Sequence, residues 1–238
     1  MDRELADLLQ QFVRVRILRM NEVDLSVFAF DYDLTWMAFC LDANEHIYSR
    51  YGGRDASSPE ARLSVAGLKD TLRRVLAEHK LRPQDEAPPP RRPVYPRDLF
   101  RVKGDCLHCH QVWEGLRRRE KDAGRFDPES LYVYPPPENI GLTLDVHAGP
   151  KIVRVQPASP AERAGLRAGD VLERVGAVRT LSQADVMWAL HNAPAAGRLP
   201  LRYLRAGQPQ TAVLELNRGW RKTDLSWRTS MRMEKKPK

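Results

Sequence analysis

Several features that would assign a protein to a common class are missing from this sequence. The longest apolar run surrounds residues 36–40 and is far shorter than the roughly 20 residues that cross a bilayer. The N-terminal "MDRELADLLQQF" lacks the basic and then apolar order of a secretory leader. There is no Gly-x-Ser-x-Gly motif and no room for a chymotrypsin-like barrel, so we expect no protease activity. Only 3 cysteines occur, and two of them lie in one short motif.

The charge is unevenly placed. The 238 residues carry a formal net charge of +8, and residues 217–238 hold eight Lys or Arg against Asp224 and Glu234, which is +6 of that total. The rest of the chain is therefore nearly neutral, and we expect no specific nucleic-acid surface. A solvated basic tail is the favoured interpretation, with an anionic membrane surface or an acidic partner as the alternative. Docking of Trp220 and Trp227 onto the protein is favoured over their binding to nucleic acid.

Helical and strand-like patterns alternate over residues 1–80. The apolar residues of "MDRELADLLQQF" have helical spacing, whereas "FVRVRIL" alternates apolar and basic residues as a strand does. "VDLSVFAF" predicts a short helix, and "TWMAFCL" and "HIYSRYGG" predict a hairpin with its turn at "DANE". Ser58 and Ser64 are start signals for a final helix. Cys40 lies in the first hairpin strand, where a cysteine is usually a small core residue.

This order, with "FVRVRI" and "DLTWMAFCLDANEHIYSRYGG", resembles a thioredoxin-like α/β domain over residues 1–80. The resemblance implies a first strand and a redox C-x-x-C ahead of the first helix, and both are missing here. Leu34 and Thr35 stand where the family has its cis-proline and threonine. The domain as given therefore cannot carry out dithiol chemistry. Either the scaffold is degenerate, or Met1 is not the true start and the missing strand lies upstream; the second is favoured because an unpaired sheet edge is unfavourable.

A proline-rich stretch separates this region from a short cysteine motif. Residues 81–98 contain six prolines and predict an extended linker. Residues 99–134 follow, with "CLHCH" just ahead of a short helix. In a C-x-x-C-H motif both thiols can bond covalently to one porphyrin, and the histidine can bind its iron. Cys106, Cys109 and His110 would then hold a c-type haem, with His110 as the metal ligand, as in the first helix of a small c-type cytochrome.

Other interpretations of the cysteine pair stay open. His108 and His110 could join the two thiolates in a zinc site, although such closely spaced ligands would be strained and no second C-x-x-C occurs. The pair could also be a free thiol redox couple or a structural disulfide. No sixth ligand for a haem iron can be chosen from the sequence.

Residues 135–216 carry the most specific pattern. "ENIGLTLD" is a glycine turn that enters a strand, "SPAERAGLRAGDVL" is a small-residue helix with a tight turn, "SQADVMWALHNAP" is an amphipathic helix and "RLPLRYLRAGQPQTAVLEL" is a closing hairpin. This succession resembles a PDZ domain of the bacterial, circularly arranged type, which is a small β-barrel-like fold with two helices. The fold class predicted for the whole chain is thus multidomain α+β.

The PDZ resemblance implies a peptide site. Backbone N–H groups of Ile140, Gly141 and Leu142 would bind a C-terminal carboxylate, and the strand formed by Leu142, Thr143 and Leu144 would accept the peptide as an added strand. The pocket for its last apolar side chain would be lined by three helix residues: Val186, Met187 and Leu190. The partner would be a protein C-terminus or an extended peptide.

The whole chain also resembles a bacterial family of thioredoxin-like/PDZ proteins, some of them selenoproteins, in which a misread selenocysteine codon would truncate the chain. That resemblance implies a periplasmic or otherwise extracytoplasmic protein if a leader precedes Met1. The function favoured by the sequence is a redox-associated adaptor that binds peptides and transfers electrons to a redox partner through a c-type haem. A thiol or selenol oxidoreductase with its motif upstream of Met1, and a non-redox PDZ adaptor with a structural disulfide or zinc, are the alternatives.

Overall fold

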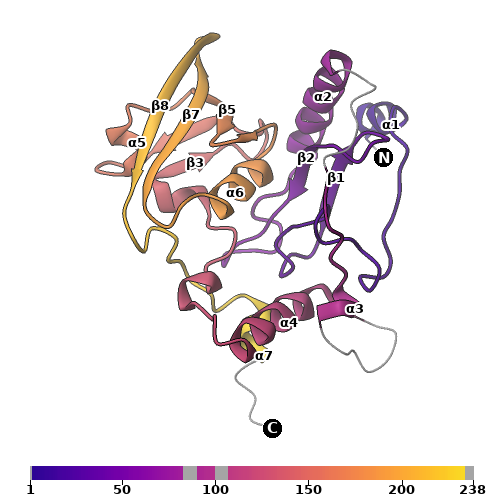
Figure 1. Cartoon of the computed structure of the whole chain (residues 1–238). Coiled ribbons are helices and arrows are strands. Elements are labelled where there is room, and N and C mark those ends of the chain that lie inside the picture. Colours follow the sequence, from indigo (N-terminus) through magenta and orange to yellow (C-terminus); the bar gives the residue numbers. More distant parts are fainter. Residues whose placement is uncertain (1, 83–89, 100–106, 234–238) are drawn as a thin grey trace.

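The computed structural model describes residues 2–82, 90–99 and 107–233, which form three groups of elements (Figure 1). The N-terminal group contains α1 (Arg3–Leu9), β1 (Met37–Leu41), β2 (Ile47–Gly52) and α2 (Val65–Leu81). The helical group contains α3 (Pro96–Leu99), α4 (Cys109–Asp122), η1 (Pro128–Leu131) and α7 (Thr229–Met233). None of the described helices is both long and apolar enough to cross a membrane.

The third group has two small sheets and the largest core. Its elements are η2 (Pro137–Ile140), β3 (Leu142–Leu144), β4 (Ile152–Val155), α5 (Pro160–Arg163), β5 (Val171–Val175), β6 (Val178–Arg179), α6 (Gln183–His191), β7 (Gly197–Arg205) and β8 (Gln208–Leu216). Antiparallel β3 and β4 form one sheet, and the other has the order β6-β5-β7-β8. Ile140, Ile152, Leu172 and Leu190 are at most 1% exposed in its core, and burial of each such side chain stabilises the fold by about 1.5–3 kcal/mol.

Two predicted features of the N-terminal group are confirmed. The hairpin forms, with Met37 opposite Gly52 and Leu41 opposite Ile47. Helix α2 begins after Ser64, whose hydroxyl accepts a hydrogen bond from the Gly67 N–H at 2.8 Å. Cys40 is buried in the cluster between the hairpin and α2, and burial raises the pKa of its thiol to about 12. It is therefore an inert core residue at neutral pH.

Two other elements predicted in this group are wrong. Residues 13–19 are not in a strand, and no backbone hydrogen bond joins them to another part of the described chain. Val13 and Val15 are 95% and 83% exposed, because an alternating pattern makes a strand only where a second strand supplies hydrogen bonds and a covering surface. The "VDLSVFAF" segment forms a turn closed by the Phe28 N–H and the Asp24 carbonyl, not a helix. The thioredoxin-like resemblance stays a prediction, since the described residues 2–82 contain no sheet larger than this two-stranded hairpin.

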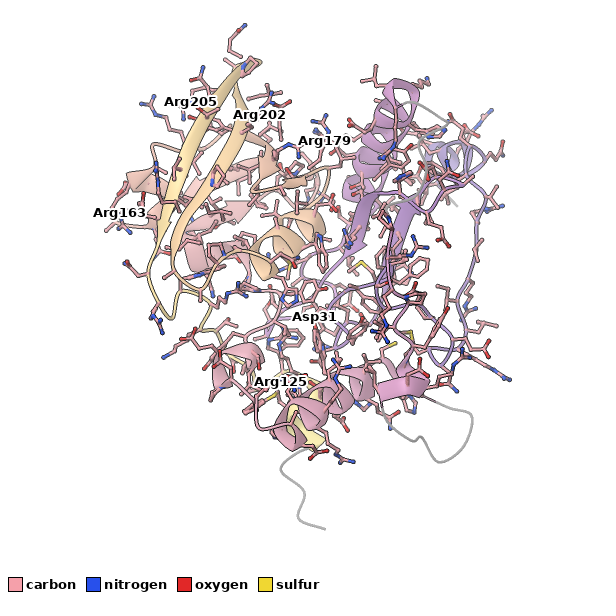
Figure 2. All side chains as sticks on the ribbon, viewed as in Figure 1. Asp31, Arg125, Arg163, Arg179, Arg202 and Arg205 are labelled. Carbon is pink, nitrogen blue, oxygen red and sulfur yellow. The ribbon has the colours of Figure 1, made fainter. Side chains whose placement is uncertain are left out.

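The C-terminal segment is not a solvated tail over the residues described. Trp220 packs against the core of the third group and donates from Nε1 to the Pro194 carbonyl at 3.0 Å. Arg228 is 2% exposed and its guanidinium lies 2.6 Å from Asp31 Oδ1 and 3.3 Å from Asp33 Oδ2. Asp31 lies where the three groups meet (Figure 2). Docking of Trp220 is thus confirmed, and Trp227 packs against Arg54 and Arg228. Among the described basic residues of this segment, Arg228 is buried and Arg221 half-buried, whereas Arg218 and Lys222 are exposed.

Candidate functional site

The turn into β3 contains the three residues predicted to bind a carboxylate, and we refer to it as the carboxylate loop. Helix η2 ends at Gly141, which has a φ of 86° and lies where a Cβ would be only 2.1 Å from Ser159 Cβ. Glycine is therefore required here both by the left-handed backbone and by the close approach. The Gly141 N–H donates to the Glu138 carbonyl at 3.0 Å, so one of the three predicted anion-binding N–H groups is already engaged within the turn.

Strand β3 has one paired edge and one free edge. On the paired edge Thr143 lies opposite Arg154, the Gly141 carbonyl accepts from Gln156 and the Asp145 N–H donates to Lys151. Main-chain groups alternate along a strand, so those of Leu142 and Leu144 point to the other edge. No hydrogen bond from the described residues reaches them there. This is the edge on which a peptide can add.

The predicted lining residues of the side-chain pocket divide between two clusters. Val186 and Leu190 are 0% exposed and pack with Ile140, Leu142 and Leu144 in the core of the third group. Met187 instead packs with Val133 and Tyr134 in a separate cluster. The structure thus brings two of the three predicted lining side chains together with Ile140 and β3 but places Met187 in another cluster.

Helix α6 is joined to the N-terminal group at its first turn. Asp185 is 1% exposed and accepts four hydrogen bonds, from the Ser49 hydroxyl at 2.6 Å and from the N–H groups of Arg50, Leu181 and Ser182 at 2.9, 3.0 and 3.1 Å. Its complete burial raises the pKa of its carboxyl, and these donors oppose that effect. The Ser182 hydroxyl also donates to the Arg50 carbonyl. Strand β2 is thereby hydrogen-bonded to the two capping side chains of α6, Ser182 and Asp185.

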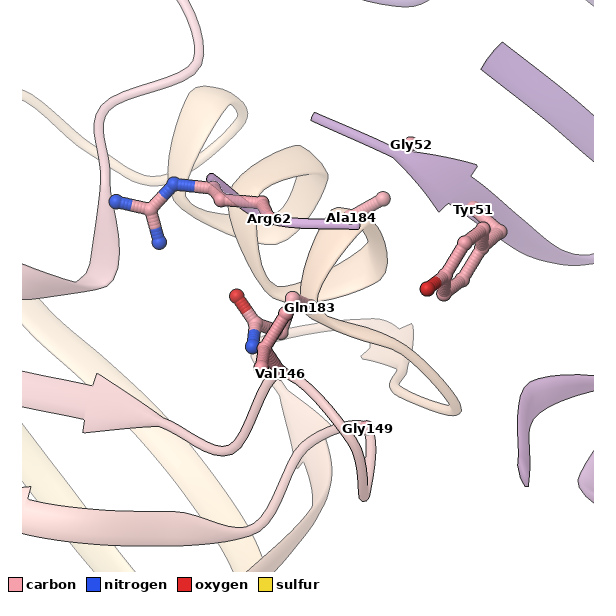
Figure 3. A pocket seen from close by; sticks show the side chains of 7 residues that line it. All are labelled: Tyr51, Gly52, Arg62, Val146, Gly149, Gln183 and Ala184. Atoms are coloured by element: carbon pink, nitrogen blue, oxygen red, sulfur yellow. The ribbon is translucent and has the colours of Figure 1, made fainter. Parts of the chain in front are cut away.

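The path between the free edge of β3 and α6, called the groove below, meets the N-terminal group where α6 begins. Figure 3 shows Tyr51, Gly52 and Arg62 on one side and Val146 and Gln183 on the other. The cavity left between them is about 10 Å³, no more than the space for a single water molecule. The Val146 carbonyl, next in the alternation after Leu142 and Leu144, accepts from the Ser64 hydroxyl at 2.8 Å. The backbone just beyond β3 is therefore covered by the N-terminal group.

A larger cleft lies beside that loop. Its volume is about 390 Å³, and it lies between residues 54–57, the segment before η2 and residues 223–228. Trp227 forms one wall, with the Arg54 and Arg228 guanidinium groups 5.0 and 4.5 Å from its ring centroid. Met187 and Glu138 also line this cleft. The cleft is lined by residues of η2 but by none of β3.

His191 ends α6 in an enclosed aromatic stack. Its ring lies 4.3 Å from that of Tyr134, and its Nδ1 accepts from the Tyr134 N–H at 3.3 Å. Burial, followed by the positive charges of Arg221 and Arg228, lowers the pKa of His191 to about 4. The imidazole is therefore neutral in the folded protein at neutral pH.

We expect this histidine to make stability fall with acidification. Its pKa is below the ordinary value of 6.5, so as the pH falls the unfolded chain binds a proton before the folded chain does. The contribution of neutral His191 to the free energy of unfolding is therefore complete above pH 6.5 and is lost as the pH falls from 6.5 to about 4. The loss corresponds to about 3 kcal/mol. Urea unfolding at pH 7.5, 6.0 and 4.5 would measure it. His191→Gln should flatten the profile in this window, and the exposed His147→Gln should not; equal profiles for both variants would contradict the assignment.

The described part of the cysteine motif is compact. Cys109 is the first residue of α4 and packs against the cluster of Tyr32 and Val112, and burial raises the pKa of its thiol. His110 Nδ1 lies 3.0 Å from Glu114 Oε1, which leaves its other ring nitrogen available as a ligand. Cys106 lies outside the described residues, so the haem, disulfide and zinc interpretations stay predictions. Among the residues placed, no three His, Cys, Asp or Glu side chains form a metal site.

Sequence analysis missed the residues that connect the groups. The capping pattern of Ser182 and Asp185 is local and could have been recognised. Nothing local links Asp185 to Ser49 and Arg50, or Arg62 to Glu138, because these partners are 76 to 136 residues apart in the chain. Their pairing depends on how the groups dock.

The loop, the free strand edge and α6 define the class of the third group as a PDZ domain. The PDZ domain family matches residues 135–216. The serine protease Do-like HtrA of Lactococcus lactis subsp. lactis (strain IL1403) is 34% identical over 77 residues, which is 32% of this chain and 19% of the relative. The same protein of subsp. cremoris (strain MG1363) gives the same identity and coverage. The chain thus contains a PDZ domain with HtrA-like homology, and it spans about a fifth of the length of these relatives.

Solved structures give matches of limited extent. The serine endoprotease from Yersinia pestis is 27% identical, with 32% of this chain and 27% of that chain covered and a TM-score of 0.28. The HtrA3 PDZ domain bound to a phage-derived ligand (FGRWV) is 22% identical, with 28% and 62% covered and a TM-score of 0.24.

Proposed function

We propose that this chain is a non-redox adaptor whose PDZ domain captures the C-terminal residues of another protein. The observation that carries the proposal is the free edge of β3, where the main-chain groups of Leu142 and Leu144 lie directly after the left-handed Gly141. An added strand would bond to those groups, and its terminal carboxylate would lie at the loop. Capture needs no cofactor and no chemistry from Cys109 or His110.

This function also agrees with the arrangement around the PDZ domain. The N-terminal and helical groups bury α6 on the side away from the PDZ core, so seven of its nine residues are buried. The buried residues include Gln183 and also Asp185, which accepts hydrogen bonds from β2. The other groups therefore hold one wall of the groove in place, which is a structural role that suits an adaptor.

Peptide binding by the full chain tests the proposal. Fluorescence anisotropy with labelled decapeptides that end in Val, Leu or Phe should show saturable binding. Amidation of the terminal carboxylate should weaken binding at least tenfold, because a charge-assisted hydrogen bond contributes more than about 1.4 kcal/mol. N-methylation should weaken binding at alternate peptide positions only, as strand pairing requires. Cys109→Ser should bind with unchanged affinity.

Two results would contradict this function. If the amide and the free acid bind equally, the loop does not hold a carboxylate. If methylation has the same effect at every position, the peptide does not add to β3 as a strand.

A further inference from the structure

One arginine of the N-terminal group lies in the groove region itself. Arg62 contributes to the wall of the small cavity beside Gln183 and also to the wall of the cleft beside the carboxylate loop, and Figure 3 shows its side chain extending along α6. Its side chain is only 8% exposed. The guanidinium makes a two-pronged contact with Glu138, at 2.8 Å from Nη2 to Oε2 and 3.4 Å from Nη1 to Oε1. Asp55 lies 3.3 Å from the same Nη2.

Glu138 lies close to the carboxylate loop. Glu138 belongs to η2, and its own carbonyl accepts from the Gly141 N–H of the carboxylate loop. A negative side chain so close to the loop would repel an incoming carboxylate. Arg62 pairs with Glu138 and also with Asp55, and the planar guanidinium is the side chain best suited to hold a carboxylate by two hydrogen bonds.

The same segment limits how far a peptide can extend. Beyond Leu144 the next outward carbonyl, that of Val146, is engaged by Ser64, and Tyr51, Gly52 and Arg62 leave a cavity of only about 10 Å³. A peptide of more than about three residues therefore meets residues 51–64 as it leaves the loop. It must displace them to pair further.

We propose that Arg62 pairs with Glu138 in the place that a basic side chain of the ligand takes on binding. The ligands of this groove are then extended peptides with an arginine or lysine close to a free C-terminus. The proposal rests on the peptide-binding function above. A ligand that displaces Arg62 leaves Glu138 without its cation unless it supplies one. A basic ligand restores the pair, a neutral one leaves the carboxylate unpaired and an acidic one adds repulsion.

Residues 51–64 compete with the peptide for the groove, and this competition lowers the peptide affinity measured for the full chain. The dissociation constant measured for the full chain is the intrinsic constant divided by the fraction of molecules in which residues 51–64 have moved aside. Removal of the Arg62 side chain should raise that fraction and leave Glu138, whose side chain is 41% exposed, available to the ligand.

Anisotropy titrations of the full chain with three matched peptides test this inference. The decapeptides share a valine C-terminus and carry Arg, Ala or Glu two residues before it. The wild-type chain should bind the Arg peptide at least tenfold more tightly than the Glu peptide. Arg62→Ala should bind the Arg peptide at least tenfold more tightly than wild type does. Glu138→Gln should bind the three peptides within about threefold of one another.

Arg179→Ala is the matched control. Arg179 on β6 lies 2.8 Å from Glu78 on α2, so this bridge joins the same two groups outside the groove (Figure 2). Its loss should leave all three affinities unchanged. If Arg179→Ala tightens binding as much as Arg62→Ala does, loosened docking explains the effect and the role of Arg62 is wrong.

The remaining outcomes distinguish failure of the proposed role of Arg62 from failure of the peptide-binding function. Equal binding of all three peptides by wild type and Arg62→Ala, with amidation still weakening it, would overturn the inference and leave the peptide-binding function intact. Absence of binding to every variant, each shown to be folded by its thermal unfolding transition, would overturn both.

Discussion

Replacing Arg228 with methionine should lower the free energy of unfolding by about 3–5 kcal/mol, because it leaves two buried carboxylates without their cation. Asp31 and Asp33 are 1% and 5% exposed, and the Arg228 guanidinium lies within 3.3 Å of both. Its second nitrogen donates to the Val133 carbonyl at 2.8 Å. Guanidinium-induced unfolding followed by circular dichroism would measure the loss.

The expected result has two controls. Arg218→Met changes an exposed arginine of the same segment and should alter stability by less than about 0.5 kcal/mol. Adding Asp31→Asn and Asp33→Asn to Arg228→Met should recover part of the loss, since the unpaired charges disappear. If the single variant is as stable as the triple variant, the ion pairs do not hold the C-terminal segment in place.

Replacing Asp185 with alanine should also lower the free energy of unfolding by about 3–5 kcal/mol. The variant would leave four buried donors without an acceptor, on Ser49, Arg50, Leu181 and Ser182, and each orphaned donor costs about 1–3 kcal/mol before relaxation. Three of the four distances are no longer than 3.0 Å. Because two of the donors belong to β2, the loss should weaken the docking of the N-terminal group on α6 as well.

Limited proteolysis separates the two effects of Asp185→Ala. Cleavage within residues 53–64 should become at least tenfold faster than in wild type, while the PDZ domain stays resistant. Asp185→Asn keeps one acceptor oxygen and should lie between wild type and alanine in stability. Asp127→Ala removes an exposed cap on η1 and should cost about 1 kcal/mol. A similar small loss for Asp185→Ala would show that the link to β2 contributes little.

Local patterns in the sequence predicted the elements with short-range causes. The β1–β2 hairpin, the start of α2 at Ser64 and the left-handed turn at Gly141 depend on alternation, a cap and a glycine. The PDZ domain could be recognised because its strands, helices and turns follow one another with little interruption. Residues 13–19 show the limit of this approach, since their strand pattern is clear but no partner strand in the described chain pairs with them.

The sequence by itself therefore determined the PDZ domain, the glycine turn at Gly141 and the strand that offers a free edge. Only the tertiary structure decided that Arg62 lies against Glu138, that Asp185 binds the backbone of β2 and that Arg228 is buried between two aspartates. Local elements follow from contacts a few residues apart, whose geometry the backbone fixes. Contacts between groups depend on which surfaces meet after each group has folded, and a charged residue has the same appearance in a sequence whether it becomes solvated or pairs across an interface.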